Sequence, residues 1–539
     1  MGKKPLEENG IHRAKMWEIG CYALNNTSTN IYAIMLMSIS YFMTGIVGVS
    51  TVVAGTFATV MRVWDGVSDP FVGFAVDRTN TKFGKNRPFI VLGQIILFVT
   101  TWIMLNVTTK LPTAVRFPFF IVIYAIYIIG YTCQCVVTKS AQSCLTNDPK
   151  QRPIFSMFDS VYGIILMNLF WPIFQTDVLV GKFTINSTTS AEKIASLIAQ
   201  NPGLANAVTE ADGVTTLSAF YNPEMWSYLQ LVLGAASAIM AVLAIAALWR
   251  KDRPQYFGTG KAYKVKARDY ADVLAHNRAI QMLVVSAGTD KLASSTMMNA
   301  TINIALFGIV MGNYSLYSSS AAITSIPIAL ISIFGIGTIA RNLGQKKCLV
   351  VGTVGAMCTA VVMFLMLLLG NPATTMLPAF KLTDLSTFGN LFKGANWSFM
   401  GVAFVILYIL LKSFSNLSGN IVIPMTADCA DYETYRTGKY VPGLMGTLFS
   451  FVDKLISSLA STIVAVSFSV IGFKSSLPTP ETPYSSGIFW VTMFCFLGMP
   501  KLGWIANLVA MKFYPLNKEK MEEIQGEIAA IKEAAMKGE

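Results

Sequence analysis

Apolar runs long enough to cross a membrane recur along nearly the whole of this 539-residue chain. A helix needs about 20 mostly apolar residues to cross the hydrocarbon core of a bilayer. Twelve such runs can be recognised, separated by polar residues, glycine or proline. They begin near Ile19, Ser50, Pro88, Phe117, Pro153, Glu224, Ala279, Ser315, Lys347, Trp397, Gly443 and Ser486. Strand-length alternation of apolar and polar residues is absent, so the sequence predicts an all-α membrane protein rather than a barrel.

The composition agrees with a membrane protein. Hydrophobic residues make up 53% of the chain and charged residues 13%, whereas soluble domains carry about 25% charged residues. The net charge of +12 follows from topology, because most lysines and arginines fall in alternate segments between the runs. By the positive-inside rule these segments, and both termini, are expected to be cytoplasmic. The basic charge therefore does not indicate a nucleic-acid partner.

Cysteine and histidine usage argues against an enzyme. All eight cysteines fall in or beside the apolar runs, so no disulfide framework is expected in the external loops. The two histidines, His12 and His276, both lie in predicted cytoplasmic segments. We therefore expect no metal cluster and no Ser/His/Asp arrangement at membrane depth. The sequence predicts a protein without catalytic activity and without a cofactor.

The chain divides around its longest basic segment, 250–278, which is the expected cytoplasmic linker. Six runs precede it and six follow it. This gives an N-terminal half over 1–249, a C-terminal half over 279–513 and a cytoplasmic tail over 514–539. A weak repeat supports the division, since KFGKNRPFIVLG follows the second run and RNLGQKKCLVVG follows the eighth. Two parallel six-helix repeats are typical of the major facilitator fold, which places its binding site at the membrane midplane between the halves.

The segment between the fifth and sixth runs, Gly181–Pro223, is long, polar and expected to be external. We expect a disordered loop here, because long loops without secondary structure of their own are commonly disordered. The alternative is a lid that contains a short amphipathic helix over Ala191–Gln200.

The second apolar run, Thr51–Val76, carries an arginine and two aspartates on one helical face. Arg62, Asp65 and Asp69 are spaced i, i+3 and i+7, so they form one charged stripe that can turn away from lipid. An ionised carboxylate near the centre of a membrane helix costs about 2.5–3.5 kcal/mol. Such a cost indicates a use, and holding a cation is the simplest one. The alternative is a buried structural salt bridge, although one arginine would leave the second carboxylate uncompensated.

The stripe belongs to a longer motif. From Arg62 to Pro88 the chain reads RVWDGVSDPFVGFAVDRTNTKFGKNRP, and from Thr426 to Tyr440 it reads TADCADYETYRTGKY. Together with Lys454, these stretches resemble the glycoside/pentoside/hexuronide:cation symporter family of the major facilitator superfamily. The resemblance covers nearly the whole chain. It implies sodium-, lithium- or proton-coupled transport of a sugar, glycoside or uronide by alternating access, in a bacterial cytoplasmic (plasma) membrane.

The resemblance also implies a cation site. Its residues, carried over by position, would be Asp65, Ser68, Asp69 and Thr132. Carboxylate and hydroxyl oxygens suit hard cations such as sodium and lithium. Lys454 resembles the family lysine that faces this site, and we assign it to coupling together with Arg62. Our hypothesis is that Lys454 replaces the cation when the site is empty; a fixed structural counter-ion is the alternative.

The positions implied for substrate binding depart from the family pattern. Asn26 stands where the family commonly has an acidic residue, and Lys139 takes the place of an aromatic residue. Both changes make the pocket more positive, which favours an anionic ligand such as a uronide. Alternatively, Lys139 snorkels to the membrane surface or pairs with Asp159. The substrate-binding candidates are Asn26, Asn30, Lys139, Asp159, Asn420 and Ser450.

A further set of charged residues lies at the predicted cytoplasmic ends of the helices. These gating candidates are Asp77, Arg87, Arg152, Asp428, Asp431 and Arg436. Salt bridges among them could close the cytoplasmic side while the other side is open. The alternative is that they serve topology and solvation alone, since an exposed ion pair contributes only about 0–1 kcal/mol.

Two other functions are compatible with these features. One is a lysolipid/sodium symporter of the same fold, and the other is a non-transporting membrane sensor that binds its ligand without accumulating it. The expected partners are a small-molecule substrate and membrane lipid. We expect no nucleic-acid partner, and we expect the chain to be a monomer.

Overall fold

A computed structural model describes residues 13–79, 81–146, 151–211, 213–253, 275–378, 385–437, 442–524 and 526–527. The regular structure of these residues is helical except for three short strands, so the predicted all-α membrane fold is confirmed. Each of the twelve predicted runs coincides with a helical stretch. Among the described residues, nine stretches are long and apolar enough to cross a membrane, or ten if the bent pair Arg278–Met297 and Ala300–Val310 is one span.

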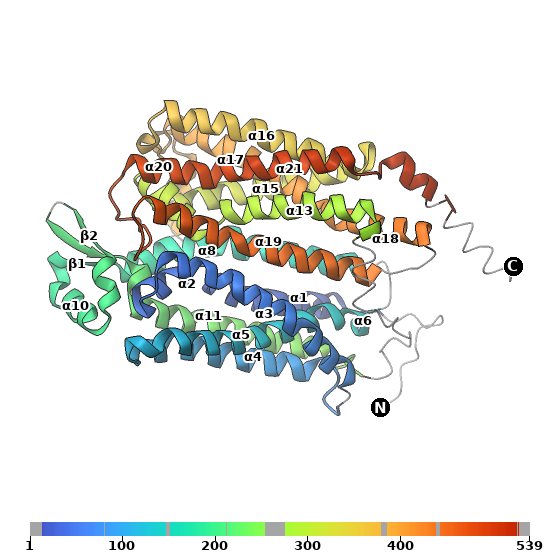
Figure 1. Ribbon diagram of the computed structural model, residues 1–539, viewed down its shortest axis with the longest axis horizontal. Helices are drawn as coiled ribbons and strands as arrows, with labels where there is room; N and C mark the ends of the chain where they lie inside the picture. Colours follow the sequence, from blue (N-terminus) through green and yellow to red (C-terminus); the bar gives the residue numbers. More distant parts are fainter. Residues whose placement is uncertain are drawn as a thin grey trace. The chain divides into compact units, whose positions relative to one another are not determined.

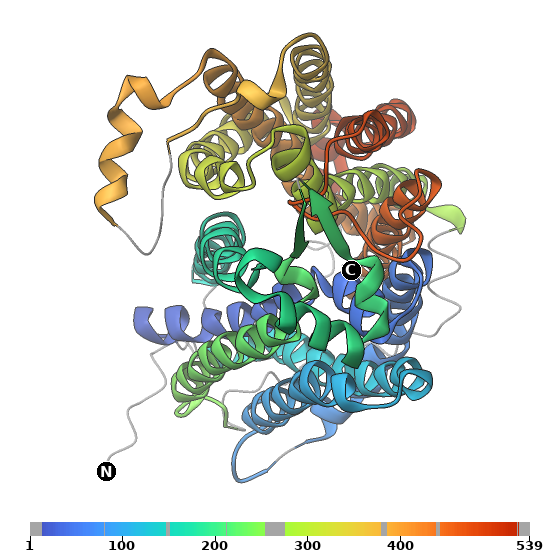
Figure 2. The ribbon, with the colours of Figure 1, turned by 90° about the vertical axis from the view of Figure 1, so that its left-hand side faces the viewer.

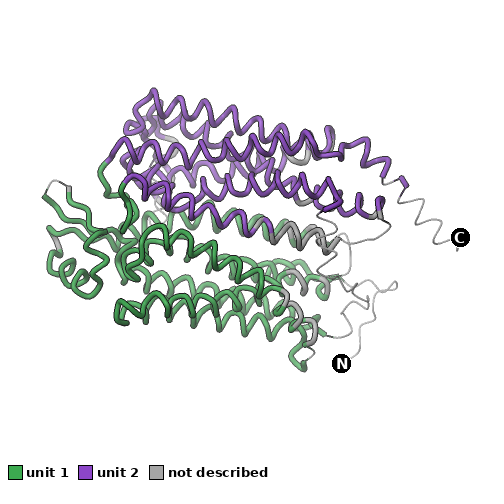
Figure 3. Tube along the Cα trace, viewed as in Figure 1, with its two compact units in different colours: residues 1–261, 381–383, 472–483 green, residues 262–380, 384–471, 484–539 purple. Residues whose placement is uncertain are grey.

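The chain forms two compact units (Figure 3). Unit 1 contains residues 1–261, 381–383 and 472–483, and unit 2 contains residues 262–380, 384–471 and 484–539. The 472–483 segment therefore packs with the first unit, although it lies between helices of the second.

Unit 1 holds the helices of the first half of the chain (Figure 1). They are α1 (Met16–Met35), α2 (Ile39–Phe42), α3 (Thr51–Arg78), α4 (Arg87–Trp102), α5 (Thr113–Ser140), α6 (Gln142–Leu145), α7 (Arg152–Ile164), α8 (Trp171–Ile173), α9 (Gly181–Phe183), α10 (Ser187–Gln200) and α11 (Pro223–Leu248). Wider π-helical turns continue several spans, at Met43–Val47, Ile103–Val107, Ile165–Phe170 and Phe174–Val180.

Unit 2 holds the helices of the second half. They are α13 (Arg278–Met297), α14 (Ala300–Asn303), α15 (Ser315–Leu343), α16 (Gln345–Leu369), α17 (Phe399–Asn420), α18 (Val422–Thr437), α19 (Pro442–Val470), α20 (Ser486–Met493) and α21 (Met499–Phe513). Helix α13 is the first part of the bent pair, and α14 with the π-helical stretch Ile304–Val310 is the second; the pair bends by 49° at its break.

Polar side chains join α1, α4 and α11 inside unit 1. The hydroxyl oxygens of Ser28 and Ser237 are 2.7 Å apart, and Gln94 donates from Nε2 to the Tyr32 hydroxyl at 2.9 Å. Lipid is as apolar as leucine, so burial of apolar surface gives helices in a membrane little reason to associate. Hydrogen bonds of this kind and close backbone contacts hold them together instead.

Hydrogen bonds and close backbone contacts also join α13, α16 and α21 inside unit 2. Ser286 donates to the side-chain oxygen of Asn507, and Asn507 Nδ2 donates to Thr353 Oγ1 at 3.0 Å. Gly503 lets α21 approach α13, since a Cβ atom there would lie 2.6 Å from the carbonyl oxygen of Thr289. A larger residue at 503 would force the two helices apart.

The segment between α9 and α11 is folded, so the expectation of a disordered loop is wrong (Figure 2). Helix α10 contains the predicted amphipathic helix. An antiparallel sheet in the order β1-β3-β2 accompanies it. The strands are β1 (Ile185–Asn186), β2 (Val208–Ala211) and β3 (Val214–Leu217). We call residues 185–221 the α10 subdomain.

The pair Asp212-Gly213 marks the β2–β3 hairpin in the sequence. Gly213 has φ +73°, the left-handed conformation that two-residue hairpin turns require. The strands on either side contain β-branched residues, and Val208 pairs with Leu217. Each of these two strands is four residues long, far shorter than a membrane-spanning run, so the pattern of apolar runs does not indicate them.

Arg116 fastens the α10 subdomain to α5. Its side chain is buried, and Nη1 donates to the Ile46 carbonyl oxygen at 2.6 Å and to Asn201 Oδ1 at 2.8 Å. Nη2 donates to the Gln200 carbonyl oxygen at 3.3 Å. Carbonyl groups at helix ends lack partners within the helix, so one guanidinium satisfies several of them at once.

The 472–483 segment is hydrogen-bonded to both α2 and the α10 subdomain. The Tyr41 hydroxyl donates to the Pro478 carbonyl oxygen at 2.7 Å, and the Leu477 amide donates to the Tyr221 hydroxyl at 2.7 Å. All four of these residues are buried. The segment is therefore a fixed part of unit 1.

Glu481 in this segment should make its attachment depend on pH. Burial raises the pKa of the Glu481 carboxyl group, and the nearby hydroxyl groups of Thr479, Ser218 and Thr184 oppose the rise. The folded segment therefore favours the protonated acid. Its stabilisation is complete below the ordinary pKa of glutamate and is lost as pH rises through the raised value. We predict that Glu481→Gln holds the segment more tightly at neutral pH.

Hydrogen exchange of the amides in 472–483 measures this effect. After correction for intrinsic rates, protection of the native segment should fall as pH rises above the ordinary pKa of glutamate, and Glu481→Gln should remove most of the fall. Glu210→Gln removes an exposed carboxylate of β2 and is the matched control, with no change expected. Identical pH profiles for the native protein and E481Q would contradict the prediction.

Candidate functional site

The charged stripe of α3 meets a hydroxyl group of α5. Asp65, Ser68 and Thr132 are buried, with side chains from 0% to 6% exposed. Thr132 Oγ1 donates to Asp65 Oδ1 at 3.3 Å, and the Ser68 and Thr132 hydroxyl oxygens are 3.2 Å apart. Three of the four residues predicted to bind a cation therefore lie in contact within unit 1. Asp69 lies one helical turn beyond Asp65 on α3 and is half-buried.

Arg62 forms an ion pair with Asp65. Its Nη1 atom is 3.2 Å from Asp65 Oδ2, and the arginine side chain is 42% exposed whereas that of Asp65 is 2% exposed. The two carboxylate oxygens of Asp65 thus have different partners, a guanidinium on Oδ2 and a hydroxyl group on Oδ1. This geometry is compatible with both readings of the stripe, a cation site and a structural ion pair.

The oxygen atoms around Asp65 are the kind that hard monovalent cations prefer. A carboxylate and two hydroxyl groups meet there, and the Ser68 hydroxyl also donates to the Asp65 carbonyl oxygen at 3.0 Å. Oxygen ligands of this type suit sodium, lithium or, at the carboxylate, a proton. Among the described residues, no group of three or more His, Cys, Asp or Glu side chains is placed to hold a metal ion.

The substrate-binding candidates are spread over both units. Asn26 on α1 lies beside the Asp159 carboxyl group of α7, whose solvent-shielded Oδ1 atom has no hydrogen-bond partner among the described residues. Asn30, one turn along α1, is half-buried. Asn420 is exposed at the end of α17 in unit 2. The side chains of Lys139 and Ser450 lie outside the described part of the structure, so the predicted pairing of Lys139 with Asp159 stays a prediction.

Lys454, the predicted coupling residue, lies on α19 in unit 2 and is half-buried. Ser457, one turn along, donates to the Lys454 backbone carbonyl oxygen at 3.1 Å. The role of Lys454 toward Asp65 and Asp69 stays a prediction.

Arg87, a gating candidate, is held by a residue that the sequence analysis did not identify. Asp252, just beyond α11, is 0% exposed and lies 3.5 Å from Arg87 Nε. Its carboxylate accepts hydrogen bonds from the amides of Lys85, Asn86 and Arg87 at 3.2, 2.9 and 3.0 Å. The Arg87 guanidinium also stacks 4.8 Å from the ring centre of Trp249. Within unit 1, Asp252 thus fixes the turn between α3 and α4.

Gly84 in the turn between α3 and α4 is a sequence signal whose meaning depends on the structure. Gly84 has φ +107°, and a Cβ atom there would lie 2.1 Å from Asp252 Oδ2. Only glycine allows the backbone to approach this carboxylate so closely. Asp252 itself stands in a basic stretch, where the sequence suggested solvation and topology rather than a buried acceptor.

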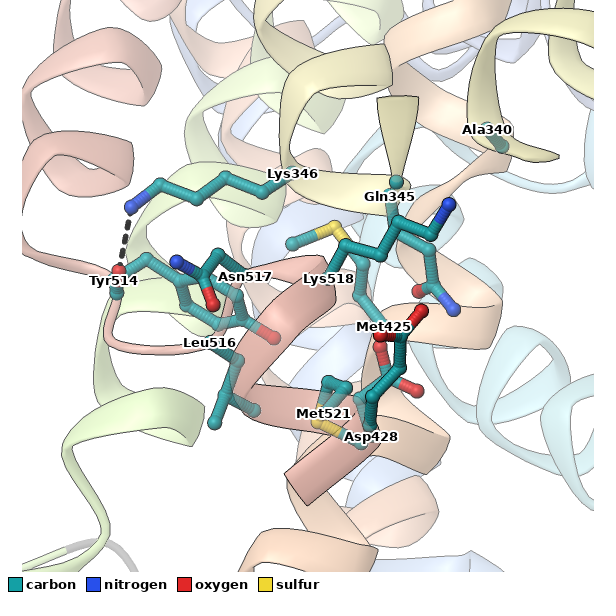
Figure 4. A pocket seen from close by; sticks show the side chains of 12 residues that line it. Ala340, Gln345, Lys346, Met425, Asp428, Tyr514, Leu516, Asn517, Lys518 and Met521 are labelled. Atoms are coloured by element: carbon teal, nitrogen blue, oxygen red, sulfur yellow. Dashed lines mark hydrogen bonds between the residues drawn. The ribbon is translucent and has the colours of Figure 1, made fainter. Parts of the chain in front are cut away.

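In unit 2, the gating candidate Asp428 lines a cavity of about 430 Å³ (Figure 4). The cavity lies between the start of α16, helix α18 and the chain that follows α21. Lys346 closes one side by donating from Nζ to the Tyr514 carbonyl oxygen at 2.7 Å. Met521 from the tail lies close to Asp428 in the same view. The tail after α21 therefore packs on the helix that carries the gating motif.

Arg436 and Asp431 are also on α18. Arg436 pairs with Glu433 at 2.9 Å, and Glu433 is buried and accepts a hydrogen bond from Asn277 Nδ2 at 2.8 Å. Asp431 is half-buried. The side chains of the other two candidates, Asp77 and Arg152, lie outside the described part of the structure. The gating roles stay a prediction.

These features define a class of protein. Long apolar helices in two units define a membrane protein with the major facilitator fold. A solved structure of the nucleoside transporter NupG has this fold, with a TM-score of 0.56 over 93% of this chain and 99% of that one, at 9% sequence identity.

The family follows from the sequence comparison. A family model described as MFS/sugar transport protein matches residues 18–518, and the chain belongs to this family of membrane transporters rather than to a family of enzymes. The Uncharacterized symporter YnaJ of Bacillus subtilis (strain 168) is 23% identical, over 97% of this chain and 96% of its own length. The Glucuronide carrier protein homolog of Escherichia coli (strain K12) is 22% identical, over 94% of both chains.

Proposed function

We propose that the protein is a cation-coupled symporter that carries a sugar, glycoside or uronide across the membrane by alternating access. The observation that carries the proposal is the contact of Thr132 with the buried Asp65 carboxylate on the charged face of α3. Relatives named as a symporter and as a glucuronide carrier homolog support the same function.

The cation site would consist of Asp65, Ser68, Asp69 and Thr132. Two carboxylates on one membrane helix are costly when both are ionised, and one guanidinium offsets only part of that cost. A bound sodium ion, lithium ion or proton reduces the cost and so changes the relative free energies of the conformations. If the substrate favours the same conformation as the cation, each increases the affinity for the other by the same factor.

The ammonium group of Lys454 would replace the cation when the site is empty, and Arg62 would hold Asp65 in place throughout the cycle. This arrangement lets the empty carrier reorient without two uncompensated carboxylates in the membrane. The substrate would bind near Asn26, Asn30 and Asp159, together with Lys139, Asn420 and Ser450 of the predicted set. A lysine in this set favours an anionic sugar such as a uronide.

The distribution of basic residues supports a plasma-membrane protein with both termini in the cytoplasm. In that orientation the tail beside Asp428 and the turn held by Asp252 are cytoplasmic, and the α10 subdomain is external. The salt bridges proposed for gating would then act on the cytoplasmic side.

Uptake into proteoliposomes tests the proposed function. We expect one member of a panel of neutral glycosides and uronides to accumulate above its external concentration under an inward sodium or proton gradient. An ionophore that collapses the gradient is the control and should abolish accumulation. Preference for acidic members would support the uronide reading.

Two outcomes would replace this proposal. Binding of a panel member without accumulation under either gradient would favour the membrane sensor. Sodium-driven movement of a lysolipid, with no transport of any sugar, would favour the lysolipid symporter of the same fold.

A further inference from the structure

Another buried carboxylate lies in unit 2, on helix α13, and the sequence analysis did not identify it. Asp290 is the thirteenth residue of the 20-residue helix α13 and is 4% exposed. Trp504 of α21 donates from Nε1 to Asp290 Oδ1 at 3.0 Å. The hydroxyl oxygen of Ser418, on α17, lies 3.2 Å from each carboxylate oxygen. Asp290 therefore sits where three helices meet.

Asp290 has no cationic partner among the described residues. Lys291, the next residue in α13, interacts with Asp290 electrostatically, but the two side chains do not form an ion pair. An ionised carboxylate has about four sites for hydrogen-bond donors, and only two hydrogen-bonding groups of the described residues, the Trp504 indole and the Ser418 hydroxyl, lie beside Asp290. An ionised group this poorly compensated inside a membrane helix costs several kcal/mol, whereas a neutral acid costs far less.

The hydrogen bonds of Ser418 indicate where the proton is. Its hydroxyl oxygen lies 2.9 Å from the Ser415 carbonyl oxygen, a shorter distance than to either oxygen of Asp290. A serine hydroxyl carries one proton, and a carbonyl oxygen can only accept. If Ser418 donates to Ser415, then its contact with Asp290 requires the aspartate to donate. Trp504 occupies Oδ1, so the proton of the acid belongs on Oδ2.

The charged residues of the helices packed against α13 leave this assignment unchanged. They are Lys412 on α17, Asp428, Asp431, Glu433 and Arg436 on α18, Asp453 and Lys454 on α19, and Lys501 and Lys512 on α21. None of those with a described side chain forms an ion pair with Asp290. Arg436 pairs with Glu433, and Lys412 lies 5.6 Å from the ring centre of Tyr408. Where α19 meets α13 at Gly288, the contact is made by Ile456.

We propose that Asp290, Ser418 and Trp504 form a proton-binding site in unit 2, in which Asp290 is a neutral acid at neutral pH and donates from Oδ2 to Ser418. The site shares no residue with the group around Asp65, and the inference does not depend on the proposed transport function. If water enters between the three helices, the acid can release its proton to water and become a carboxylate. The site then binds and releases a proton on the Asp290 carboxyl group, apart from the group around Asp65.

Infrared spectroscopy of the full-length protein in lipid tests the proposal. The C=O stretch of a neutral carboxylic acid should be present at neutral pH and should shift in D₂O. It should shift again when aspartate is labelled with ¹³C at the carboxyl carbon, which needs no substitution. Asp290→Asn should remove the component assigned to this site. Glu224→Gln is the matched control, because it removes an exposed carboxylate that pairs with Lys193 and should leave the band intact.

A second measurement separates a neutral acid from an ionised ligand. Asparagine keeps one acceptor for Trp504 and one donor for Ser418, so D290N should fold with the thermal midpoint of the native protein. Asp290→Leu removes the hydrogen bonds to both Trp504 and Ser418 and should lower the thermal midpoint. Three results would overturn the proposal: no aspartic acid band at neutral pH, a band unchanged in D290N, or a band lost when sodium replaces potassium at constant pH. The last would assign the site to a metal cation.

Discussion

Replacing Asp65 with asparagine should lower the affinity for the coupling cation by roughly 10- to 150-fold. Hydrogen bonds and contacts to a charged group contribute about 1.5–3 kcal/mol, and each 1.4 kcal/mol is a factor of ten in affinity. Asparagine has nearly the shape of aspartate but carries no charge to attract a cation. The Arg62 side chain that it leaves behind is 42% exposed, so solvation should limit the cost to folding.

Substitutions of Thr132 give a graded companion to this result. Thr132→Val removes the hydroxyl group that donates to Asp65 and keeps the shape of the side chain, so cation affinity should fall by roughly 2- to 10-fold. Thr132→Ser keeps the hydroxyl group and is the matched control. Asp69→Asn tests the fourth residue of the predicted site, one turn further along α3.

Initial uptake rates measured against sodium or proton concentration check this series. The expected order of half-saturating cation concentration is native and T132S lowest, T132V higher, and D65N highest or unmeasurable. Substrate binding at saturating cation is measured in parallel, to separate loss of coupling from loss of folding. An unchanged cation dependence in D65N would favour the structural ion pair, and the cation site would have to be sought elsewhere.

The charged stripe of α3 could be predicted because its residues are close together in the sequence of one helix. Helical spacing places Arg62, Asp65 and Asp69 on one face, and the cost of charge in a membrane makes such a face informative. The distance between Arg62 and Asp65 confirms the shared face. The contact with Thr132 was available only through the family resemblance, since nothing in the spacing of α3 identifies a partner on α5.

The residues that the sequence analysis missed have partners far away in the chain. Asp252 accepts from amides more than 160 positions before it, and those donors are backbone groups that no side-chain pattern marks. Asp290 depends on Ser418 and Trp504, which are 128 and 214 positions away. Single polar residues in apolar runs are easily attributed to packing, so their significance depends on what the fold brings beside them.

The α10 subdomain illustrates a different limit. Its hairpin has a clear local signal in Asp212-Gly213, but the strands are too short to resemble the membrane-spanning runs around them. The 472–483 segment has no local signal at all for its place in unit 1. Its hydrogen bonds to Tyr41 and Tyr221 follow from tertiary packing alone.

Asp252→Ala should be among the most destabilising single substitutions in unit 1. The carboxylate is 0% exposed and accepts hydrogen bonds from three backbone amides and from Asn86 Nδ2 at 3.0 Å. It also forms an ion pair with Arg87, whose Nε atom is 3.5 Å away. Alanine leaves these donors without an acceptor in a buried place. Removing one partner of a buried ion pair costs about 3–5 kcal/mol, which corresponds to roughly 150-fold or more in the unfolding equilibrium.

Titration with a denaturing detergent in mixed micelles measures the free energy of unfolding of these variants. Asp252→Asn should fall between the native protein and D252A, because its amide oxygen still accepts while its NH₂ group faces other donors. Glu224→Ala is the control, since it breaks an exposed pair with Lys193 that should contribute only about 0–1 kcal/mol. If D252A unfolds with the same free energy as E224A, the turn between α3 and α4 does not depend on this carboxylate. The position of Arg87 would then have to come from its stacking on Trp249, which Trp249→Ala would test on its own.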